Sequence, residues 1–464
     1  MRLGGDARTR QGRLQNMNLS SADKRPRDSW IYRACIRLYR LRKYLYFRLI
    51  GLRYRKKTEK YRAEFDESTG NLDKLPADFP KGVLYVYAIG VGEVQSALAL
   101  ISEVDRAEFA TIVLAVHSVD GKAMAEYIAS GCVDAVIYGP WDAPQFVKRT
   151  LERLCPKAYI VVELENKPTP VMLDELHRRK IPLFMVNASR PRAHAVDWEK
   201  PHFFWSGVLD CFEKIMLRSE EEKEKLLKLG LSGDKLIVTG NFKVDGLRVR
   251  RKGLDLSRWD VLKNGEGPVF LAGSIWPNEA QSVFEAFERL RERFPCARLV
   301  VAPRFLKDVG RVAEILRSRD SSLEAVLLSG LSGQSRWDVA IVDTIGVLFE
   351  LYAVADAAFV GGSLDKRGGQ NLMEPAVFGI PVTHGPHMAD FPESLDMDGC
   401  GASKTVFDAE ELSRAWLDPL DPAFRARTAA ACGNYFRSVG GAAERSWEII
   451  RDSLLKSGAL KNTR

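Results

Sequence analysis

Short, almost fully apolar runs alternate with charged, helix-like stretches from residue 80 to about residue 390, and this alternation limits the possible folds more than any other feature. Seven such runs occur in the first part of the chain, at 83–89, 110–116, 135–139, 158–164, 182–188, 214–219 and 235–240. Five more follow at 268–274, 297–303, 324–330, 339–344 and 357–362. Strands that are apolar along their length, with helices between them, indicate parallel sheets covered on both faces. The fold class is therefore α/β.

The rhythm is interrupted once, which predicts two α/β domains. Residues 246–266 break the apolar pattern and are typical of a linker. We expect Rossmann-like domains at 80–246 and 247–464, preceded by a basic arm over 1–79. The last 60 residues of the chain are predicted to be helical. A chain of 464 residues is long enough for two or three domains with separate cores.

The positive charge of the chain is concentrated in the arm. Residues 1–58 contain 17 Lys and Arg and three Asp, a balance of +14, so the total of +8 leaves −6 for the rest. The globular part therefore gives no reason to expect a nucleic-acid partner. The 7 cysteines are scattered and show no CxxC or Cys/His spacing. This pattern predicts reduced thiols in a cytosolic protein and no metal site.

Residues 29–57 combine ten Lys and Arg with aromatic and aliphatic residues and contain no acid. Such a segment can lie in the headgroup layer of a membrane, with its basic residues on anionic lipid. The alternative is a helix packed on the body with a solvated basic face, and RNA binding is a weaker option. The sequence contains no uninterrupted run of about 18 apolar residues, so no transmembrane helix is predicted. The N-terminus also lacks the apolar region of a signal peptide.

The stretch Phe359–Pro386 is the most distinctive candidate site. It predicts a strand at 356–360, a glycine-rich loop at 361–371, a helix start at Glu374–Pro375 and a short strand at 380–383. A glycine-rich loop lets backbone N–H groups approach an anion closely, and a helix N-terminus adds partial positive charge. The alternative is a tight turn in which the glycines serve geometry only.

Acidic residues follow two predicted strands of the first domain. Glu93 opens a helix directly after the first strand, where a carboxylate can take a proton from a bound hydroxyl. It could instead only complement the positive helix N-terminus. Glu163 lies at the end of the run 158–164, and Glu165 directly follows that run. As residues i and i+2 of one strand they would point the same way. We count Glu165 with Glu93 as a candidate catalytic acid, with solvated loop acids as the alternative.

Three segments together resemble the Kdo (3-deoxy-D-manno-octulosonic acid) transferases of lipopolysaccharide synthesis, which are two-domain glycosyltransferases of the B type. GGSLDKRGGQNLMEPAVFGIPVTHGPHMADF, at 361–391, looks like the family's most distinctive signature. AIGVGEVQSA, at 88–97, resembles its Ser-x-Gly-Glu segment, and TGNFKVD, at 239–245, resembles its Thr-Gly-Asn/Ser-x-Lys-x-Asp segment. The similarity runs from about Val83 to Glu393. A terminal helix commonly crosses back to the first domain in such two-domain transferases.

The resemblance implies a reaction. The donor would be CMP-Kdo, and a hydroxyl of a lipid A precursor would attack its anomeric carbon with inversion, while Glu93 accepts the proton. The work would take place at the cytoplasmic face of the inner membrane, with residues 29–57 on the membrane surface. No Asp-x-Asp metal motif precedes the phosphate site, so loop amides and cationic side chains would stabilise the leaving charge without a cofactor.

The resemblance also assigns the donor-binding residues. The CMP phosphate would lie near the loop of Gly361, Gly362 and Ser363 and the turn at Asn371, and Glu374 would meet the ribose. The further donor-side residues are Lys243, Ser274 and Arg304.

The chain departs from the family at several of these segments. Ser-Thr-His is replaced by Ser274-Ile275-Trp276, Pro-Arg-His by Pro303-Arg304-Phe305, and Gly-His-Asn by Gly369-Gln370-Asn371. The segment Glu-x-Glu-Leu-Trp-Pro-Asn becomes ELENKPT at 163–169. Two alternatives stay open: a B-type transferase or sugar-nucleotide epimerase with another nucleotide sugar, and a membrane-bound scaffold that keeps the fold without the chemistry.

Overall fold

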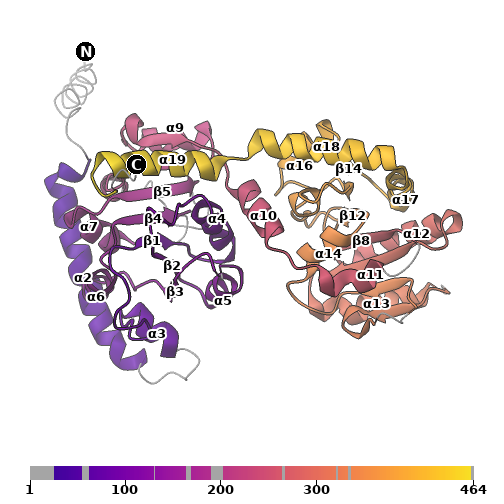
Figure 1. Cartoon of the computed structure of the whole chain (residues 1–464), viewed down its shortest axis with the longest axis horizontal. Helices are drawn as coiled ribbons and strands as arrows, with labels where there is room; N and C mark the ends of the chain where they lie inside the picture. The colour runs from indigo at the N-terminus through magenta and orange to yellow at the C-terminus, as the bar shows by residue number, and fades with distance from the viewer. Residues whose placement is uncertain are drawn as a thin grey trace, which may run out of the picture. The chain divides into compact units, whose positions relative to one another are not determined.

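The computed structural model describes residues 26–54, 62–129, 131–163, 169–189, 202–263, 267–319, 322–332 and 336–460. The chain divides into two compact units (Figure 1). Unit 1 consists of Met1–Gly246 and Gly441–Arg464, and unit 2 of Leu247–Gly440. Each unit is built around one parallel sheet, as the alternation of strands and helices predicts.

Unit 1 contains a seven-stranded sheet in the order β3-β2-β1-β4-β5-β6-β7, with all neighbouring strands parallel. The strands are β1 Leu84–Tyr87, β2 Ile112–Val116, β3 Ala135–Tyr138, β4 Ala158–Val162, β5 Leu183–Ala188, β6 Lys214–Leu217 and β7 Leu236–Val238. The helices that connect them are α4 Val91–Ile101, α5 Val119–Ile128, α6 Pro144–Leu154, α7 Pro170–Arg178, α8 His202–Leu209 and α9 Glu220–Lys228. All seven strands coincide with the predicted apolar runs.

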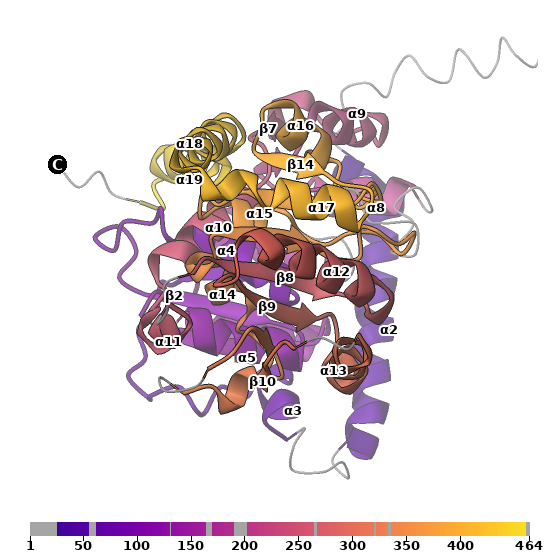
Figure 2. The same cartoon turned by 90° about the vertical axis from the view of Figure 1, so that its right-hand side faces the viewer.

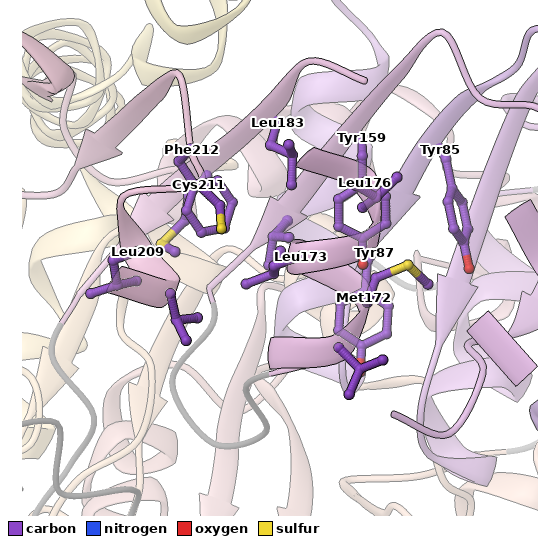
Figure 3. Close-up of a cluster of buried hydrophobic side chains, with 14 of the residues drawn as sticks. Tyr85, Tyr87, Tyr159, Met172, Leu173, Leu176, Leu183, Leu209, Cys211 and Phe212 are labelled. Carbon is purple, nitrogen blue, oxygen red and sulfur yellow. The ribbon is translucent and has the colours of Figure 1, made fainter. Parts of the chain in front are cut away.

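Alternate residues of these strands enter two separate cores. On one face, Tyr85, Tyr87 and Tyr159 pack against α7, whose residues Met172 and Leu173 lie beside them (Figure 3). The other face carries the remaining apolar positions of the strands and is covered by α4, α5 and the C-terminal helix α19, Ala442–Lys456. A strand buried on both faces is apolar at every position, because successive side chains point to opposite sides.

Helix α19 does not belong to the predicted domain 247–464; instead it packs on unit 1, as the resemblance implies for a terminal helix. Trp447, Ile450 and Leu454 of this helix are buried in the core of unit 1. Asp245 binds the first turn of α19 through the backbone N–H groups of Gly441 and Ala443, at 2.8 and 3.0 Å. A carboxylate at a helix N-terminus satisfies donors that have no partner within the helix. The terminal helix therefore belongs to unit 1.

The described part of the arm is not a separate segment. Helix α2, Trp30–Tyr54, packs on unit 1, and its residues Tyr32 and Ile36 are each only 2% exposed. A second short helix, α3, spans Arg62–Ser68. This is the packed helix that the sequence left open as an alternative to a segment in the headgroup layer of a membrane. None of the helices in the described residues is long and apolar enough to cross a membrane.

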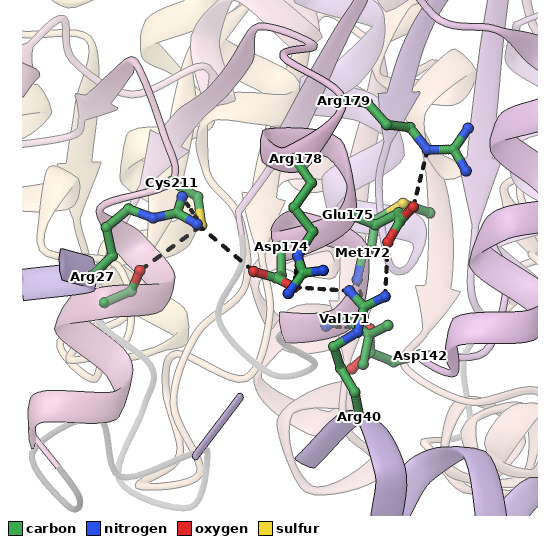
Figure 4. Close-up of polar contacts among 11 residues, drawn as sticks. Arg27, Arg40, Asp142, Val171, Met172, Asp174, Glu175, Arg178, Arg179 and Cys211 are labelled. Carbon is green, nitrogen blue, oxygen red and sulfur yellow. Dashed lines mark hydrogen bonds and ion pairs between the residues drawn. The ribbon is translucent and has the colours of Figure 1, made fainter. Parts of the chain in front are cut away.

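Ion pairs hold α2 against α7 (Figure 4). Arg40 donates to Asp174 and to Glu175, each at 2.8 Å. Arg27, in the turn before α2, lies 3.7 Å from the other oxygen of Asp174 and donates to the sulfur of Cys211. Because Asp174 is buried, its pairing with arginine stabilises the attachment more than an exposed pair would.

Unit 2 contains a second seven-stranded parallel sheet, in the order β10-β11-β9-β8-β12-β13-β14. Its strands are β8 Val269–Ile275, β9 Arg298–Pro303, β10 Ala325–Leu327, β11 Val339–Ile341, β12 Ala357–Val360, β13 Val382–His384 and β14 Ser403–Thr405. Of these, β14 was not predicted from the sequence, because its three residues, Ser-Lys-Thr, carry no apolar signal.

Helices cover both faces of this sheet (Figure 2). One core is formed with α12 Pro277–Arg293, α13 Val309–Ser318 and α17 Ala409–Ala415, and the other with α11 Asp260–Lys263 and α14 Leu348–Val354. The remaining helices are α10 Lys243–Lys252, which begins in unit 1, and α15 Met373–Ala376, α16 Glu393–Gly399 and α18 Pro422–Val439.

Asp142 is a buried carboxylate between the sheet of unit 1 and α2. It accepts hydrogen bonds from the backbone N–H groups of Val171 and Met172, both at 3.0 Å, in the first turn of α7. Burial raises the pKa of Asp142 to about 6, although these two bonds, Lys43 and Tyr39 act to lower it. Ionisation of Asp142 is therefore more costly in the folded protein than in the unfolded chain.

We expect this burial to make unit 1 less stable as the pH rises. Because the pKa of Asp142 is higher in the folded state, the folded state binds the proton more tightly, and its stabilising effect is lost as the pH rises through about 6. The asparagine does not titrate, so Asp142→Asn does not show this loss. The free energy of unfolding of the variant minus that of wild type should be about 2 kcal/mol higher at a pH of about 7.5 than at a pH of about 4.5. Urea unfolding of the full chain at the two pH values measures this, with the exposed Asp78→Asn as control. An unchanged difference between Asp142→Asn and wild type would contradict it.

Candidate functional site

The sequence-predicted residues in the described parts lie at the carboxyl ends of the strands, in both units. Open parallel sheets bind their ligands at this edge, because the loops that follow the strands gather there. Glu93 and Lys243 belong to unit 1, whereas Ser274, Arg304 and the stretch Phe359–Pro386 belong to unit 2. The two edges are described in turn.

Glu93 lies in the first turn of α4, three residues after the loop that leaves β1. Its Oε2 accepts a hydrogen bond from the backbone N–H of Gly90 at 3.2 Å, and the side chain is half-buried. This contact is the helix-terminal interaction that the sequence left open as an alternative role. It also fixes the orientation of a carboxylate that keeps part of its surface accessible, so the contact is compatible with a base in this position.

Glu163 lies beyond the end of the strand on which the sequence places it. Strand β4 ends at Val162, and Glu163 has a left-handed backbone with φ of 56°. Its carboxylate accepts a hydrogen bond from Ser96 at 2.8 Å and forms an ion pair with Arg218 at 2.5 Å. Glu163 is therefore held by protein groups, and Glu165 lies outside the described residues.

Asn187 joins the ends of three strands in the same cluster. It ends β5 with φ of 53° and is buried. Its side-chain Nδ2 donates to Glu163 at 2.5 Å. Its side-chain Oδ1 accepts from Arg218 at 3.2 Å and from the backbone N–H of Phe242 at 3.0 Å. Non-glycine residues with positive φ are strained and concentrate at functional sites. This cluster thus fixes the loop that carries Lys243.

The segment 239–245 has both structural residues and one site candidate. Thr239 accepts hydrogen bonds from Arg445 and Ser446 of α19, just as Asp245 binds the start of that helix. Lys243 is the first residue of α10 and is half-buried, and its N–H donates to the side chain of Asn241 at 3.0 Å. The role of Lys243 in binding a ligand stays a prediction.

Glu279 organises the corresponding edge of unit 2. It lies in the first turn of α12 and is only 2% exposed. Its Oε2 accepts hydrogen bonds from the N–H groups of Gly362, at 2.6 Å, and Trp276, at 3.0 Å, and its Oε1 from that of Leu364, at 3.0 Å. Three backbone donors on one buried carboxylate are a strong, directional set of contacts. Glu279 therefore fixes the glycine-rich loop.

These contacts change the interpretation of the loop amides. The N–H of Gly361 donates to the carbonyl of Gly273 in β8 at 2.8 Å, and that of Gly362 is taken by Glu279. Ser363 is fully buried, with its hydroxyl donating to the carbonyl of Val360. The N–H groups of Gly361 and Gly362 therefore already have protein acceptors, whereas the expectation that the CMP phosphate lies near this loop stays a prediction.

Glycine is nevertheless required in the loop by close packing. A Cβ on Gly361 would lie 2.5 Å from the Cα of Ile275. Gly362 has φ of 76°, and a Cβ there would lie 2.5 Å from the carbonyl oxygen of Gly368. Both distances are far below van der Waals contact, so these glycines serve the geometry of the turn, which was the alternative left open from the sequence.

The first turn of α12 also holds the far end of the loop. Asn278 donates to Asp365 at 2.5 Å, and Asp365 forms an ion pair with Arg367 at 3.3 Å. The guanidinium of Arg367 lies 4.4 Å from the ring centre of Trp276, a cation–π contact. Trp276 and the neighbouring residues of α12 thus fix the loop and orient an exposed arginine on it.

The other predicted donor residues line the same edge. Ser274 ends β8 with φ of 58°, and Arg304 follows β9 with an exposed side chain. Asn371 accepts a hydrogen bond from the N–H of Met373 at 3.2 Å, which begins α15. Glu374 in this helix is half-buried, and it acts with burial, the larger cause, to raise the pKa of Tyr352. The structure therefore brings Ser274, Arg304, Asn371 and Glu374 to one edge of one unit.

The sequence did not point to Glu279, Asn187 or Arg218 as residues that hold the site. Asn187 and Arg218 lie near the ends of predicted apolar runs, and Glu279 lies in the first turn of the helix after one, which places all three at the carboxyl edge. That position was the available signal. What each side chain binds depends on which strands are neighbours, and strand order is not written in the periodicity of the sequence.

Glu279→Gln should destabilise unit 2 without changing its surface. The amide would point an N–H group at a backbone donor, so one buried hydrogen bond becomes a repulsive contact that costs about 2–4 kcal/mol. Calorimetric melting of the full chain measures the loss. Glu285→Gln, on the solvent side of the same helix, is the matched control and should change stability by less than about 0.5 kcal/mol. Equal melting temperatures for both variants would contradict the role of Glu279.

Comparison with known proteins agrees with the motifs. Residues 55–246 match the family model of the 3-deoxy-D-manno-octulosonic-acid transferases. The chain is 30% identical over 326 residues to the 3-deoxy-D-manno-octulosonic acid transferase of Aquifex aeolicus, covering 69% of this chain and 82% of that protein. It is 28% identical over 371 residues to the enzyme of the same name from Haemophilus influenzae, covering 77% of this chain and 84% of that protein.

Solved structures confirm the fold class. A UDP-GlcNAc 2-epimerase from Neisseria meningitidis superimposes with a TM-score of 0.53 at 16% identity, covering 81% of this chain and all of that one. A glycosyltransferase from Rickettsia africae gives a TM-score of 0.51 at 12% identity, with 81% and 99% coverage. At such identities the likeness shows the two-domain architecture of B-type glycosyltransferases and no more. The relatives of higher identity are decisive: this chain belongs to the family of 3-deoxy-D-manno-octulosonic acid transferases.

Proposed function

We propose that this chain transfers Kdo from CMP-Kdo to a hydroxyl of a lipid A precursor, with inversion at the anomeric carbon. Family membership makes it a glycosyltransferase of the Kdo type. The single observation that carries the proposal is the 30% identity to a Kdo transferase over 82% of that enzyme's length. The arrangement of Glu93, Arg304 and Glu374 at the ligand-binding edges of their sheets supports it.

In this proposal Glu93 is the general base. The acceptor oxygen attacks the anomeric carbon, the bond from that carbon to the phosphate oxygen breaks, and CMP leaves with the electron pair. Glu93 takes the proton of the attacking hydroxyl. Its hydrogen bond from Gly90 orients the carboxylate toward the edge of the sheet, which is what a base acting on a bound hydroxyl requires. Glu165 remains a candidate for a second acid on the acceptor side.

The donor half depends on side chains more than on loop amides. Because Gly361 and Gly362 already donate to protein acceptors, we assign the phosphate of CMP to the guanidinium of Arg304. Lys243, in unit 1, stays a predicted donor-side residue. Gly361, Gly362 and Ser363 shape the loop, and Asn371 sets the start of α15. Glu374, in that helix, is assigned to the ribose hydroxyls, and Ser274 to the donor side of β8. Cations near the leaving group stabilise its developing negative charge.

The test is Glu93→Gln in a transfer assay with CMP-Kdo and a lipid A precursor, read by mass spectrometry. The variant should bind CMP with wild-type affinity in calorimetry, because Glu93 belongs to the acceptor side. Its kcat should fall about 10²–10⁴-fold, because the hydroxyl proton loses its acceptor. Glu152→Gln, an exposed glutamate on α6, should behave as wild type.

Full turnover by Glu93→Gln would remove that residue as the base. Calorimetry with CMP and UMP tests the donor separately. A site built for cytosine should reject uracil, because its hydrogen-bonding groups are left without partners. Equal affinity for the two nucleotides, or no transfer by wild type, would favour another nucleotide sugar.

We also propose that the enzyme works at the cytoplasmic face of the inner membrane, with the outer face of α2 on the lipid surface. Its exposed apolar residues are Trp30, Ile31, Leu38, Leu41, Leu45, Tyr46 and Leu49. Arg33, Arg37, Arg42 and Arg48 are exposed on the same helix. Apolar side chains of this kind can enter the headgroup region while arginines meet anionic lipid.

Removing the arm is a poor test, because Tyr32 and Ile36 belong to the core of unit 1. The full chain with Leu38→Ser, Leu45→Ser and Leu49→Ser changes only exposed residues, so its melting temperature should stay within a few degrees of wild type. We expect it to sediment at least about tenfold less with anionic phosphatidylglycerol vesicles, because apolar contact area is lost. Tyr127→Ser, exposed on α5, is the control. Undiminished sedimentation of the triple variant would exclude this face of α2.

A further inference from the structure

His384 ends β13 with its ring enclosed between two hydrogen-bond acceptors. The residue is 2% exposed. Its Nδ1 lies 2.8 Å from the carbonyl oxygen of Gly385, and its Nε2 lies 3.1 Å from Oδ1 of Asp398. A backbone carbonyl only accepts hydrogen bonds, so Nδ1 must carry a proton and donate it. The charge of the ring then depends on the state of Asp398.

Asp398, in α16, is held as a carboxylate. The hydroxyls of Ser403 and Thr405, in β14, donate to its two oxygens, each at 2.5 Å. Burial raises the pKa of Asp398, but the hydrogen bonds from His384 and these two hydroxyls outweigh burial and hold that pKa below its ordinary value. An ionised carboxylate only accepts, so Nε2 of His384 must donate as well. A ring that donates from both nitrogens is an imidazolium.

The imidazolium acts on the turn that follows β13. The backbone N–H of Gly385 donates to the hydroxyl of Ser363 at 2.7 Å, and that of His387 donates to the carbonyl of Ser363 at 3.0 Å. A Cβ on Gly385 would lie 2.2 Å from the same carbonyl oxygen, so the turn and the loop are in direct contact. Gly369, farther along the loop, donates to the carbonyl of His387 at 2.7 Å. The turn 385–387 thus supports the glycine-rich loop along its length.

We propose that His384 and Asp398 form a buried imidazolium–carboxylate pair that positions the glycine-rich loop for the donor. The ring holds the carbonyl of Gly385, and the N–H of the same residue binds Ser363. The inference rests on the proposed function, in which this loop shapes the donor site. His384 and Asp398 act through Gly385 and are positioning residues, not catalytic ones. Charge-assisted hydrogen bonds are about twice as strong as neutral ones, which suits them to hold a turn in one geometry.

The charge of the ring is testable without any substrate. The full chain is labelled with ¹⁵N-histidine, and two-bond ¹⁵N–¹H correlation spectra report which ring nitrogens carry protons. The signal that disappears in His384→Gln belongs to His384. In wild type at neutral pH we expect both nitrogens of this ring to be protonated. In Asp398→Asn we expect a neutral ring with its proton on Nδ1, because the amide can donate to Nε2. A neutral ring in wild type would overturn the proposal.

The positioning role is tested by steady-state kinetics with CMP-Kdo. The glutamine in His384→Gln cannot contact both the carbonyl of Gly385 and the carboxylate of Asp398, as the charged ring does. Its KM for the donor should therefore rise about tenfold, with kcat within about twofold of wild type. Asp398→Asn keeps the Nδ1–H bond to Gly385 and should raise KM by less than about threefold. Asp396→Asn, exposed on the same helix, is the matched control.

An unchanged donor KM in His384→Gln would refute the positioning role. If that variant does not fold, the wild-type spectrum and the kinetics of Asp398→Asn still decide the matter, since a donor KM for Asp398→Asn raised as much as tenfold would contradict retention of the Gly385 contact. If wild type does not turn over CMP-Kdo, the proposed function fails, whereas the spectrum still judges the ion pair.

Discussion

The buried carboxylate of Glu279 is the contact on which the carboxyl edge of the sheet in unit 2 depends. It accepts three backbone N–H groups, two of them from the glycine-rich loop and one from its own helix. Leaving a buried ion without such partners costs several kcal/mol, so helix α12 and the loop are stable only in each other's presence. The loop therefore owes its shape to a side chain 83 residues earlier in the chain, and its glycines allow the backbone to come close enough for the contact.

In unit 1, a different set of side chains holds the loops at the carboxyl edge of the sheet. These are Glu163, Asn187 and Arg218, which contact one another at the ends of β4, β5 and β6. Two of these residues adopt positive φ values, a strain that the surrounding hydrogen bonds maintain. In both units, then, acidic and amide side chains next to the predicted site bind the protein itself. The groups left to face a ligand are fewer, and mostly cationic or half-buried.

Much of the fold could be predicted from the sequence, because strands buried on both faces are apolar at every position and interrupt the helical pattern clearly. The prediction failed where that signal is weak or where distant segments meet. Strand β14 is short and polar. The range 247–464 wrongly included α19, whose contacts with Asp245 and Thr239 no local pattern reveals; only the resemblance implied that a terminal helix crosses back. For the site, motifs and strand ends predicted Glu93 and Arg304, and both residues follow strands at the carboxyl edge of their sheets. The sequence could not show that the amides of Gly361 and Gly362 bind the protein, because their acceptors come from another strand and another helix.

The placement of α19 has a consequence for how the chain is made. Unit 1 is discontinuous: its first 246 residues are synthesised before unit 2, and its closing helix comes only after residue 440. Until then, the face of the sheet that receives Trp447 and Ile450 is covered by α4 and α5 but lacks its third helix. Unit 2 is continuous and can complete its core as soon as it leaves the ribosome, whereas unit 1 must wait for the last helix of the nascent chain. A stop codon shortly before residue 441 would thus spare the later-made unit and leave the earlier one incomplete.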